Sequence, residues 1–150
     1  MKKLYALRVY GLNVLDLMCG KGRSAEVLFK WWNDIRDKRL GRMKKDGTLV
    51  LVDISEAMLE EAKSKNYETN PRVITHCRNV KTLDWNMFNN VKFDVVIGWW
   101  NLCYLRTPEQ RQSYINGLLL VIANGGIVFL CEPVSETPMR IGKIHDECHE

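Results

Sequence analysis

The stretch Asn13–Arg23, NVLDLMCGKGR, decides the fold of this chain. Its first part, Asn13–Met18, is apolar on both sides of its pleat until Asp16, which is typical of a parallel strand covered by helices on both faces. The turn CGKGR follows directly, and a segment of helical period starts at Ser24. A strand, a glycine turn and a helix in this order predict the first unit of an α/β domain.

Short β-branched runs alternate with longer segments of helical period along the rest of the chain. We therefore expect residues 1–150 to form a single domain built on a doubly wound parallel sheet. The expected strands are Asn13–Met18, Thr48–Asp53, Val73–Cys77, Phe93–Gly98 and Ile127–Glu132; the expected helices are Ser24–Asp37, Glu56–Lys65 and one that begins near Pro108.

The apolar residues of these helices predict which face of each helix packs on the sheet. Thr107, Pro108 and Gln110 predict the start of the last helix, and Asn124-Gly125-Gly126 predicts its end. The residues expected to face the sheet are Val27, Leu28, Trp31, Trp32 and Ile35 in the first helix, Met58, Leu59 and Ala62 in the second, and Ile115, Leu118, Leu119 and Ile122 in the last.

The composition narrows the functional classes without naming a ligand. The chain is 46% hydrophobic and 27% charged, and no apolar run approaches the roughly 20 residues of a membrane span. The net charge of +4 is too small to require a nucleic-acid partner. The basic stretch Arg36–Lys45 is expected to be a solvated connection rather than an RNA patch, because no aromatic residue interrupts its charges.

The chain has five cysteines, an odd number, and they are widely separated in the sequence. This pattern suggests a reducing intracellular setting, cytoplasmic or nuclear. No pair forms a CxxC motif, so a zinc site is not expected. His145, Cys148 and His149 resemble metal ligands, but they are interpreted as part of a solvated tail.

Two features at successive strand ends favour a nucleoside ligand. Gly20 and Gly22 allow a ligand to approach the backbone ahead of a helix N-terminus, which favours an anionic or carbonyl group. Asp53, at the end of the second strand, can accept two hydrogen bonds from a ribose diol. Because Gly20–Ala25 also satisfies the GxGxxA dinucleotide pattern, a nicotinamide cofactor remains an alternative.

Four segments resemble motifs I, II, IV and VI of class I S-adenosylmethionine-dependent methyltransferases. They are VLDLMCGKGR, LVLVDISEAMLEEAK, FDVVIGWWNLCYL and NGGIVFLCEPV, and together they cover most of the chain. The resemblance implies a Rossmann-like sheet and S-adenosylmethionine as the cofactor, with S-adenosylhomocysteine as its product. The cofactor-binding residues that it implies are Asp16 and Gly20, Gly22 and Arg23 in motif I, Asp53 and Ile54 in motif II, Val80 and Lys81 after the third strand, and Trp99 after the fourth.

Within this superfamily the chain is similar to the eukaryotic α-N-terminal protein methyltransferases, which act on Xaa-Pro-Lys starts. The similarity rests on VDISEAMLEEAK, on Trp100-x-Leu-x-Tyr104-Leu105 and on NGGIVFLCE. It implies a protein or peptide N-terminus as the acceptor, with Trp100 as a wall of a proline-sized pocket. Tyr104 is then the candidate catalytic residue that accepts or relays a proton, and Glu132 attracts the substrate ammonium.

Three other interpretations remain open. VLDLMCGKG also resembles the loop of messenger-RNA cap guanine methyltransferases, so RNA is an alternative acceptor, as is a small molecule. Met18 replaces the first glycine of the family loop and Pro133 replaces an asparagine, so a catalytically inactive binding subunit is a further alternative. The family carries an antiparallel hairpin after strand five, and 16 residues follow Val134 here. We therefore expect a sheet truncated after strand five, with its edge covered by a partner chain or by the tail.

Overall fold

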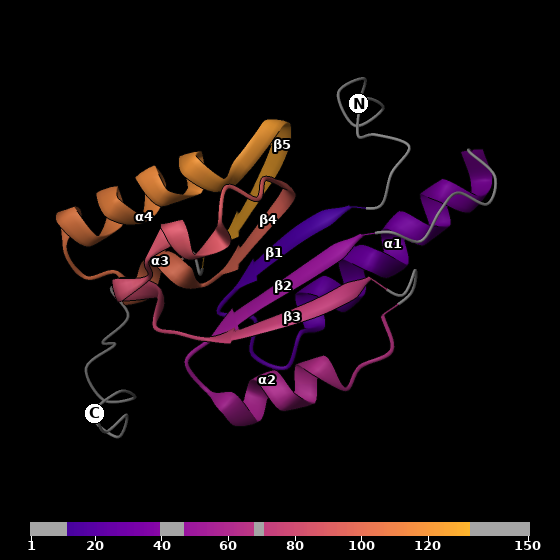
Figure 1. Cartoon of the computed structure of the whole chain (residues 1–150), viewed down its shortest axis with the longest axis horizontal. Helices are drawn as coiled ribbons and strands as arrows, with labels where there is room; N and C mark the ends of the chain where they lie inside the picture. Colours follow the sequence, from indigo (N-terminus) through magenta and orange to yellow (C-terminus); the bar gives the residue numbers. More distant parts are fainter. Residues whose placement is uncertain (1–11, 40–46, 68–70, 133–150) are drawn as a thin grey trace.

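The computed structural model describes residues 12–39, 47–67 and 71–132, although the side chains of residues 33–39 are not described. Five strands form one parallel sheet in the order β3-β2-β1-β4-β5, which confirms the expected Rossmann-like architecture (Figure 1). The elements are β1 Asn13–Leu17, α1 Arg23–Arg39, β2 Thr48–Asp53, α2 Glu56–Lys63, β3 Arg72–Cys77, η2 Val80–Thr82, η3 Trp85–Phe88, β4 Phe93–Trp99, α3 Asn101–Tyr104, α4 Pro108–Val121 and β5 Ile122–Cys131.

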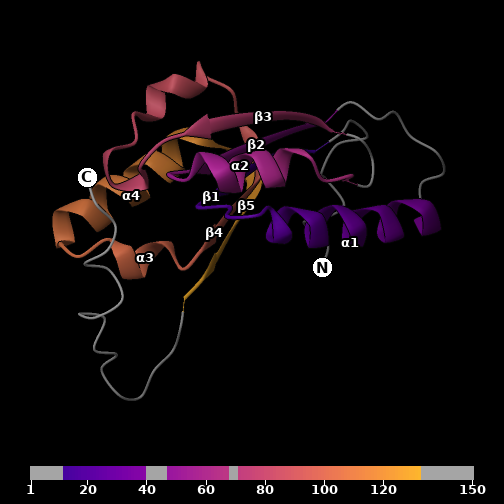
Figure 2. The same ribbon diagram turned by 90° about the horizontal axis from the view of Figure 1, so that it is seen from below.

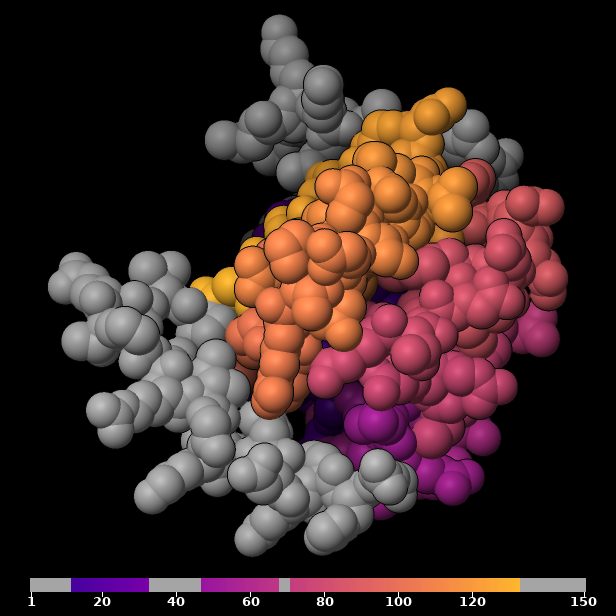
Figure 3. All heavy atoms as spheres, turned by 90° about the vertical axis from the view of Figure 1, so that its left-hand side faces the viewer, coloured from indigo at the N-terminus to yellow at the C-terminus, as the bar shows by residue number. Residues whose placement is uncertain are grey.

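Alternate side chains along the strands pack into two separate cores, one on each face of the sheet. Val14 of β1 packs with Phe29 of α1 and Leu59 of α2, whereas Leu15 packs with Tyr114 of α4 on the opposite face. Figure 2 shows α1 along one side of the sheet, and Figure 3 shows α4 beside the chain that links β3 to β4. This arrangement leaves the carboxyl ends of the strands accessible between the two layers.

The boundary between α4 and β5 differs from the sequence-based expectation. The helix ends at Val121, and Asn124-Gly125-Gly126 lies inside β5 rather than at the end of the helix. Ile122 already pairs with Phe93, and the next pair joins Val95 to Ile127, so β5 advances five residues while β4 advances two. The glycine-rich stretch therefore accommodates an irregularity in the strand.

The buried faces of the helices also differ from expectation. In α1, Ala25 and Phe29 are buried, whereas Val27 and Trp31 are exposed. In α2, Leu59 and Ala62 are buried as expected, but Met58 is exposed. Leu28 and Trp32 pack against the same core as Phe29, as expected, and the side chain of Ile35 is not described. The predicted faces were therefore right in part, and the errors arose because exposed aromatic and aliphatic side chains resemble core residues in the sequence pattern.

The same error affects α4. Its buried residues are Tyr114, Gly117, Leu118 and Val121, whereas Leu119 is 69% exposed and Ile115 is also exposed. The predicted start of this helix is confirmed, because Thr107 and Gln110 form the capping box and Pro108 occupies the first turn. Local capping chemistry thus located the helix more accurately than its apolar pattern oriented it.

β5 forms one edge of the described sheet, with β4 as its neighbour. Phe129 and Leu130 are exposed near its carboxyl end. A covering partner chain stays a prediction, and the tail from residue 133 lies outside the described residues. Among the described residues, no helix combines the length and apolar character that a membrane span requires.

Candidate functional site

Asp53 links the carboxyl ends of β1 and β2. Its Oδ2 accepts a hydrogen bond of 2.8 Å from the Gly20 N–H, and its Oδ1 accepts one of 2.9 Å from the Ser55 N–H. The Cys19 N–H also donates to the Val52 carbonyl at 3.1 Å. Asp53 therefore holds the glycine turn against β2, a role that the sequence analysis did not assign to it.

The two glycines of this turn serve different purposes. Both have positive φ angles, 50° at Gly20 and 73° at Gly22. A Cβ atom on Gly20 would meet no heavy atom within 4 Å, whereas one on Gly22 would collide with the Tyr67 hydroxyl and approach Ala62. Gly20 thus borders open space in which a ligand can approach the backbone, and Gly22 allows close internal packing.

Met18 stands in this turn in place of the family glycine. It adopts a φ of 54°, a left-handed conformation that costs a non-glycine residue roughly 1–2 kcal/mol. Its side chain packs against the core cluster on the α4 face of the sheet. The substitution therefore keeps the turn conformation and directs the added side chain into the core.

Asp16 is fully buried beneath this turn, and neither of its carboxylate oxygens has a hydrogen-bond partner. Burial raises its pKa to about 7, and the negative charge of Asp53 contributes in the same direction. The backbone N–H of Ala25 lowers the pKa in part but lies outside hydrogen-bonding geometry. A nearby cation would stabilise the ionised form of this buried, unpartnered carboxyl group.

The residues expected to surround an adenosine moiety differ in their exposure to solvent. Ile54 follows Asp53 and is 68% exposed, so it offers an apolar surface at the end of β2. Val80 begins η2 and is buried in the core on the α4 face, whereas Lys81 is exposed. Ile54 is therefore better placed than Val80 to contact a ligand.

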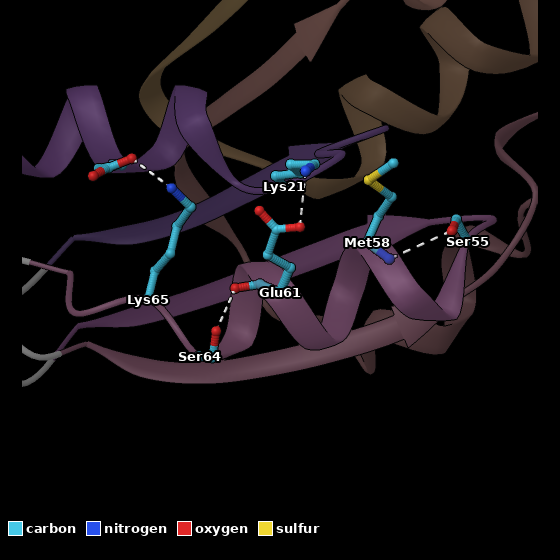
Figure 4. Close-up of polar contacts among 7 residues, drawn as sticks. Lys21, Ser55, Met58, Glu61, Ser64 and Lys65 are labelled. Atoms are coloured by element: carbon cyan, nitrogen blue, oxygen red, sulfur yellow. Dashed lines mark hydrogen bonds and ion pairs between the residues drawn. The ribbon is translucent and has the colours of Figure 1, made fainter.

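One ion pair joins α2 to the glycine turn, and a second joins Lys65, just after α2, to α1 (Figure 4). Lys21 Nζ lies 3.0 Å from Glu61 Oε2, and Lys65 Nζ lies 2.7 Å from Glu26 Oε2. Ser55 caps α2 by accepting the Met58 N–H at 3.4 Å. Because both pairs are solvent-exposed, they orient the helix more than they stabilise the fold.

An aromatic turn, Trp99–Tyr104, follows β4 beside the glycine turn. Trp99 and Trp100 are each half exposed, and the Trp100 N–H donates to the Cys131 carbonyl at 2.7 Å. Tyr104, the candidate proton acceptor, is the last residue of α3 and is partly buried.

Glu132 follows β5 and contacts the same turn through hydrogen bonds. Its Oε1 accepts the Leu102 N–H at 2.9 Å, and its Oε2 accepts the Cys103 N–H at 3.2 Å. The carboxylate expected to attract a substrate ammonium therefore also stabilises the first turn of α3, which the sequence analysis missed.

A cavity of about 730 Å³ lies between α1 and the carboxyl ends of β4 and β5. It brings Arg23, at the end of the glycine turn, together with Trp99. Its lining is mainly apolar and includes no carboxylate: Arg23, Ser24, Val27, Leu28, Trp31, Ile97, Trp99, Phe129, Leu130 and Cys131.

The predicted site residues thus gather at the carboxyl edge of the sheet. Asp16, Gly20, Gly22, Arg23, Asp53 and Ile54 lie at the ends of β1 and β2, Val80 and Lys81 after β3, and Trp99, Trp100, Tyr104 and Glu132 at the ends of β4 and β5. Among the described residues, no group of three or more potential metal ligands is present. His145, Cys148 and His149 lie outside the described residues.

Comparisons with known proteins agree with this arrangement. The profile of a methyltransferase domain family matches residues 9–150. A solved S-adenosylmethionine-dependent methyltransferase from Clostridium acetobutylicum is 22% identical, with a TM-score of 0.58 over 79% of this chain and 41% of that chain. Phosphoethanolamine N-methyltransferase 1 from Haemonchus contortus is 18% identical, with a TM-score of 0.62 over 89% of this chain and 25% of that one.

The N-methyltransferase NodS from Bradyrhizobium japonicum, solved with S-adenosylhomocysteine, is 16% identical, with a TM-score of 0.56 over 86% of this chain and 59% of NodS. No curated protein matches the chain. The chain spans less than two thirds of the length of each of these solved structures. Because the family profile covers nearly every residue, the chain belongs to the methyltransferase domain family and has the fold of the S-adenosylmethionine-dependent methyltransferases.

Proposed function

We propose that this chain binds S-adenosylmethionine at the ends of β1 and β2 and transfers its methyl group to a nitrogen acceptor, the α-amino group of a protein N-terminus. The observation that carries the cofactor proposal is the hydrogen bond between Gly20 and Asp53. This bond places the turn that a ligand can approach next to the carboxylate that can bind a ribose, at the carboxyl edge of the sheet.

The residues present fit this cofactor. Gly20 borders open space, and Ile54 exposes its side chain next to Asp53. Each oxygen of Asp53 uses one backbone hydrogen bond and retains acceptor capacity for a ribose hydroxyl. Arg23, the first residue of α1, is exposed where it can pair with the carboxylate of the methionine portion.

The acceptor proposal rests on the resemblance of the aromatic turn and β5 to the α-N-terminal protein methyltransferases. When bound, S-adenosylmethionine supplies a methyl group on a positively charged sulfur that an amine lone pair can attack. An α-amine has a pKa near ~7.7 to 8.0 and is substantially neutral at physiological pH, so a strong base is not required. Trp99 and Trp100 would orient the acceptor and exclude water, and Tyr104 would accept or relay the released proton.

A second acceptor class is favoured by one observation. The cavity beside Trp99 is mainly apolar, and among its lining residues Arg23 is charged while no carboxylate is present. A substrate with lysine as its third residue gains no ion pair in this cavity. A small molecule with an apolar or aromatic body would suit it better.

The cofactor proposal is tested by calorimetric titration with S-adenosylhomocysteine. We expect micromolar binding by the wild type and loss of binding in Asp53→Ala. Asp84→Ala is the matched control, because Asp84 also accepts a backbone N–H, from Asn86 at 3.0 Å, but lies at the start of η3. Equal binding by all three proteins would overturn the assignment of Asp53.

The acceptor proposal is tested with labelled S-adenosylmethionine and two peptides that begin Ala-Pro-Lys, one with a free and one with an acetylated N-terminus. We expect the label only on the free peptide, because acetylation removes the α-amine and leaves the lysine unchanged. Label on both peptides would indicate lysine methylation, and label on an apolar small amine alone would favour the second acceptor class.

A further inference from the structure

The backbone of Trp100 has an unusual conformation. With φ 60° and ψ 23°, it lies in the left-handed region that large side chains rarely adopt. Such a conformation persists only where surrounding contacts determine it, and strained residues of this kind cluster at functional sites. Trp100 is half exposed and follows the cavity-lining Trp99, so its backbone conformation sets the direction of an exposed indole at the end of β4.

The next residue connects this exposed turn to the core. Asn101 is fully buried, and its Nδ2 donates a hydrogen bond of 2.6 Å to the hydroxyl of Tyr114 in the middle of α4. The other polar atom of the amide, Oδ1, has no partner, so this bond to Tyr114 is the one that orients the side chain. Tyr114 is itself 2% exposed and therefore cannot touch a ligand.

The pair also lies tightly against β4. A Cβ atom on Gly98 would be 2.6 Å from Asn101 Nδ2 and 2.8 Å from the Tyr114 hydroxyl. The absence of a side chain at Gly98 thus leaves room for the bond directly behind the end of the strand. Gly98 lies two residues before Trp100 and Asn101 directly follows it, so the pair adjoins the turn on both sides of Trp100.

From these contacts we infer that Tyr114, acting through Asn101, is a positioning residue for methyl transfer that holds Trp100 in its left-handed conformation at the acceptor side of the site. The inference rests on the proposed function for its catalytic consequence. The Trp100 N–H to Cys131 bond and the Glu132 carboxylate hold the same turn from the β5 side. From α4, Arg111 Nε donates to the Leu105 carbonyl at the end of α3, whereas Tyr114 bonds Asn101, the residue next to Trp100.

Tyr114→Phe separates this role from packing. The ring, which lies edge-on to Trp85 at 5.7 Å, is retained, and the bond to Asn101 is lost. Thr107→Ala is the matched control, because it removes the N-cap of the same helix, α4, without altering the bond. Both variants should lower the stability of α4, but only Tyr114→Phe should release Asn101.

The first readout is the ¹⁹F spectrum of chains labelled with fluorotryptophan, with the Trp100 resonance assigned by Trp100→Phe. We expect one narrow Trp100 resonance in the wild type and in Thr107→Ala, and a broadened or doubled one in Tyr114→Phe. An unchanged Trp100 resonance in Tyr114→Phe, or the same change in Thr107→Ala, would overturn the inference.

The second readout separates turnover from binding. For the free Ala-Pro-Lys peptide we expect kcat to fall about tenfold in Tyr114→Phe, while the dissociation constant for S-adenosylhomocysteine stays within about twofold. Equal losses in Thr107→Ala would reduce Tyr114 to a stability role. If the wild type binds no S-adenosylhomocysteine, the proposed function fails, whereas the ¹⁹F comparison still decides whether Tyr114 fixes Trp100.

Discussion

The carboxyl groups of Asp16 and Asp53 repel each other across the adjoining ends of β1 and β2. Asp16 pairs with Leu51, two residues before Asp53, so the two carboxyl groups point to the same face of the sheet. Burial is the larger cause of the raised pKa of Asp16, and the charge of Asp53 adds to it. Ionisation of Asp16 is therefore unfavourable beside Asp53, and a neighbouring cationic group would stabilise the ionised form.

The raised pKa of Asp16 predicts a pH dependence of stability. The pKa of Asp16 is about 7 in the folded chain against an ordinary value of 3.8, so the folded state retains a proton that the unfolded state loses. The free energy of unfolding should then fall as pH rises from about 4 to about 7, by at most ~1.4 kcal/mol per pH unit from this group. Urea unfolding across this range should show a smaller fall in Asp16→Asn, and identical slopes would contradict the assignment.

The two glycines of the turn predict opposite phenotypes. In Gly20→Ala the new methyl group enters open space where the ligand approaches, so binding of S-adenosylhomocysteine should weaken at least tenfold, with a stability loss of roughly 1–2 kcal/mol from the left-handed backbone. In Gly22→Ala the methyl group collides with the Tyr67 hydroxyl, so the main effect should be a larger loss of stability. Calorimetric titration and thermal unfolding of both variants distinguish the two outcomes.

The collision at Gly22 provides its own rescue experiment. Tyr67→Phe removes the obstructing oxygen, although it also removes the hydrogen bond of 2.8 Å that the hydroxyl donates to the Ala62 carbonyl. The double variant Gly22→Ala/Tyr67→Phe should therefore be more stable than the sum of the two single losses predicts. Strict additivity of the unfolding free energies would show that the strain lies in the backbone.

Glu132 allows two roles that mutation can separate. As a carboxylate that accepts two N–H groups of α3, it should contribute about 1.5–3 kcal/mol per bond at most, and Glu132→Gln should lower the melting temperature. If Glu132 instead binds the substrate ammonium, Glu132→Gln should raise KM for the free peptide without a change in stability. We expect the loss of stability to dominate, and thermal unfolding together with peptide kinetics decides between the roles.

Much of the fold follows from local sequence patterns. β2 begins and ends where its apolar run and terminal aspartate predict, and the capping box places the start of α4. The predicted end of α4 was wrong, because Asn124-Gly125-Gly126 has the local sequence pattern of a helix end. The helix ends earlier because Ile122 pairs with Phe93, a residue distant in the sequence. A propensity of single residues cannot anticipate such pairing.

The site shows the same division. The sequence located Gly20 and Asp53 at neighbouring strand ends, but it could not show that they bond to each other over 33 positions. The bonds from Leu102 and Cys103 to Glu132 likewise join segments about 30 residues apart. Residue types that can bind a ligand were thus identifiable, whereas the contacts that fix their geometry depend on the tertiary structure.

The bond between Asn101 and Tyr114 predicts a specific sensitivity at Gly98. In Gly98→Ala the new methyl group would lie within 3 Å of Asn101, Tyr114 and Leu130, so the bond must lengthen or the strand must shift, at a cost of about 1–3 kcal/mol. Gly125→Ala is the matched control, because its φ of 78° imposes backbone strain but no heavy atom lies within 4 Å of the added Cβ.

Both variants should therefore lose stability, but Gly98→Ala alone should disturb the ¹⁹F resonance of Trp100. Adding Tyr114→Phe to Gly98→Ala removes one of the obstructing atoms, so the double variant should be less destabilised than the sum of its parts. An equally altered Trp100 resonance in Gly125→Ala would mean that weaker pairing of β4 with β5, rather than the bond between Asn101 and Tyr114, controls the aromatic turn.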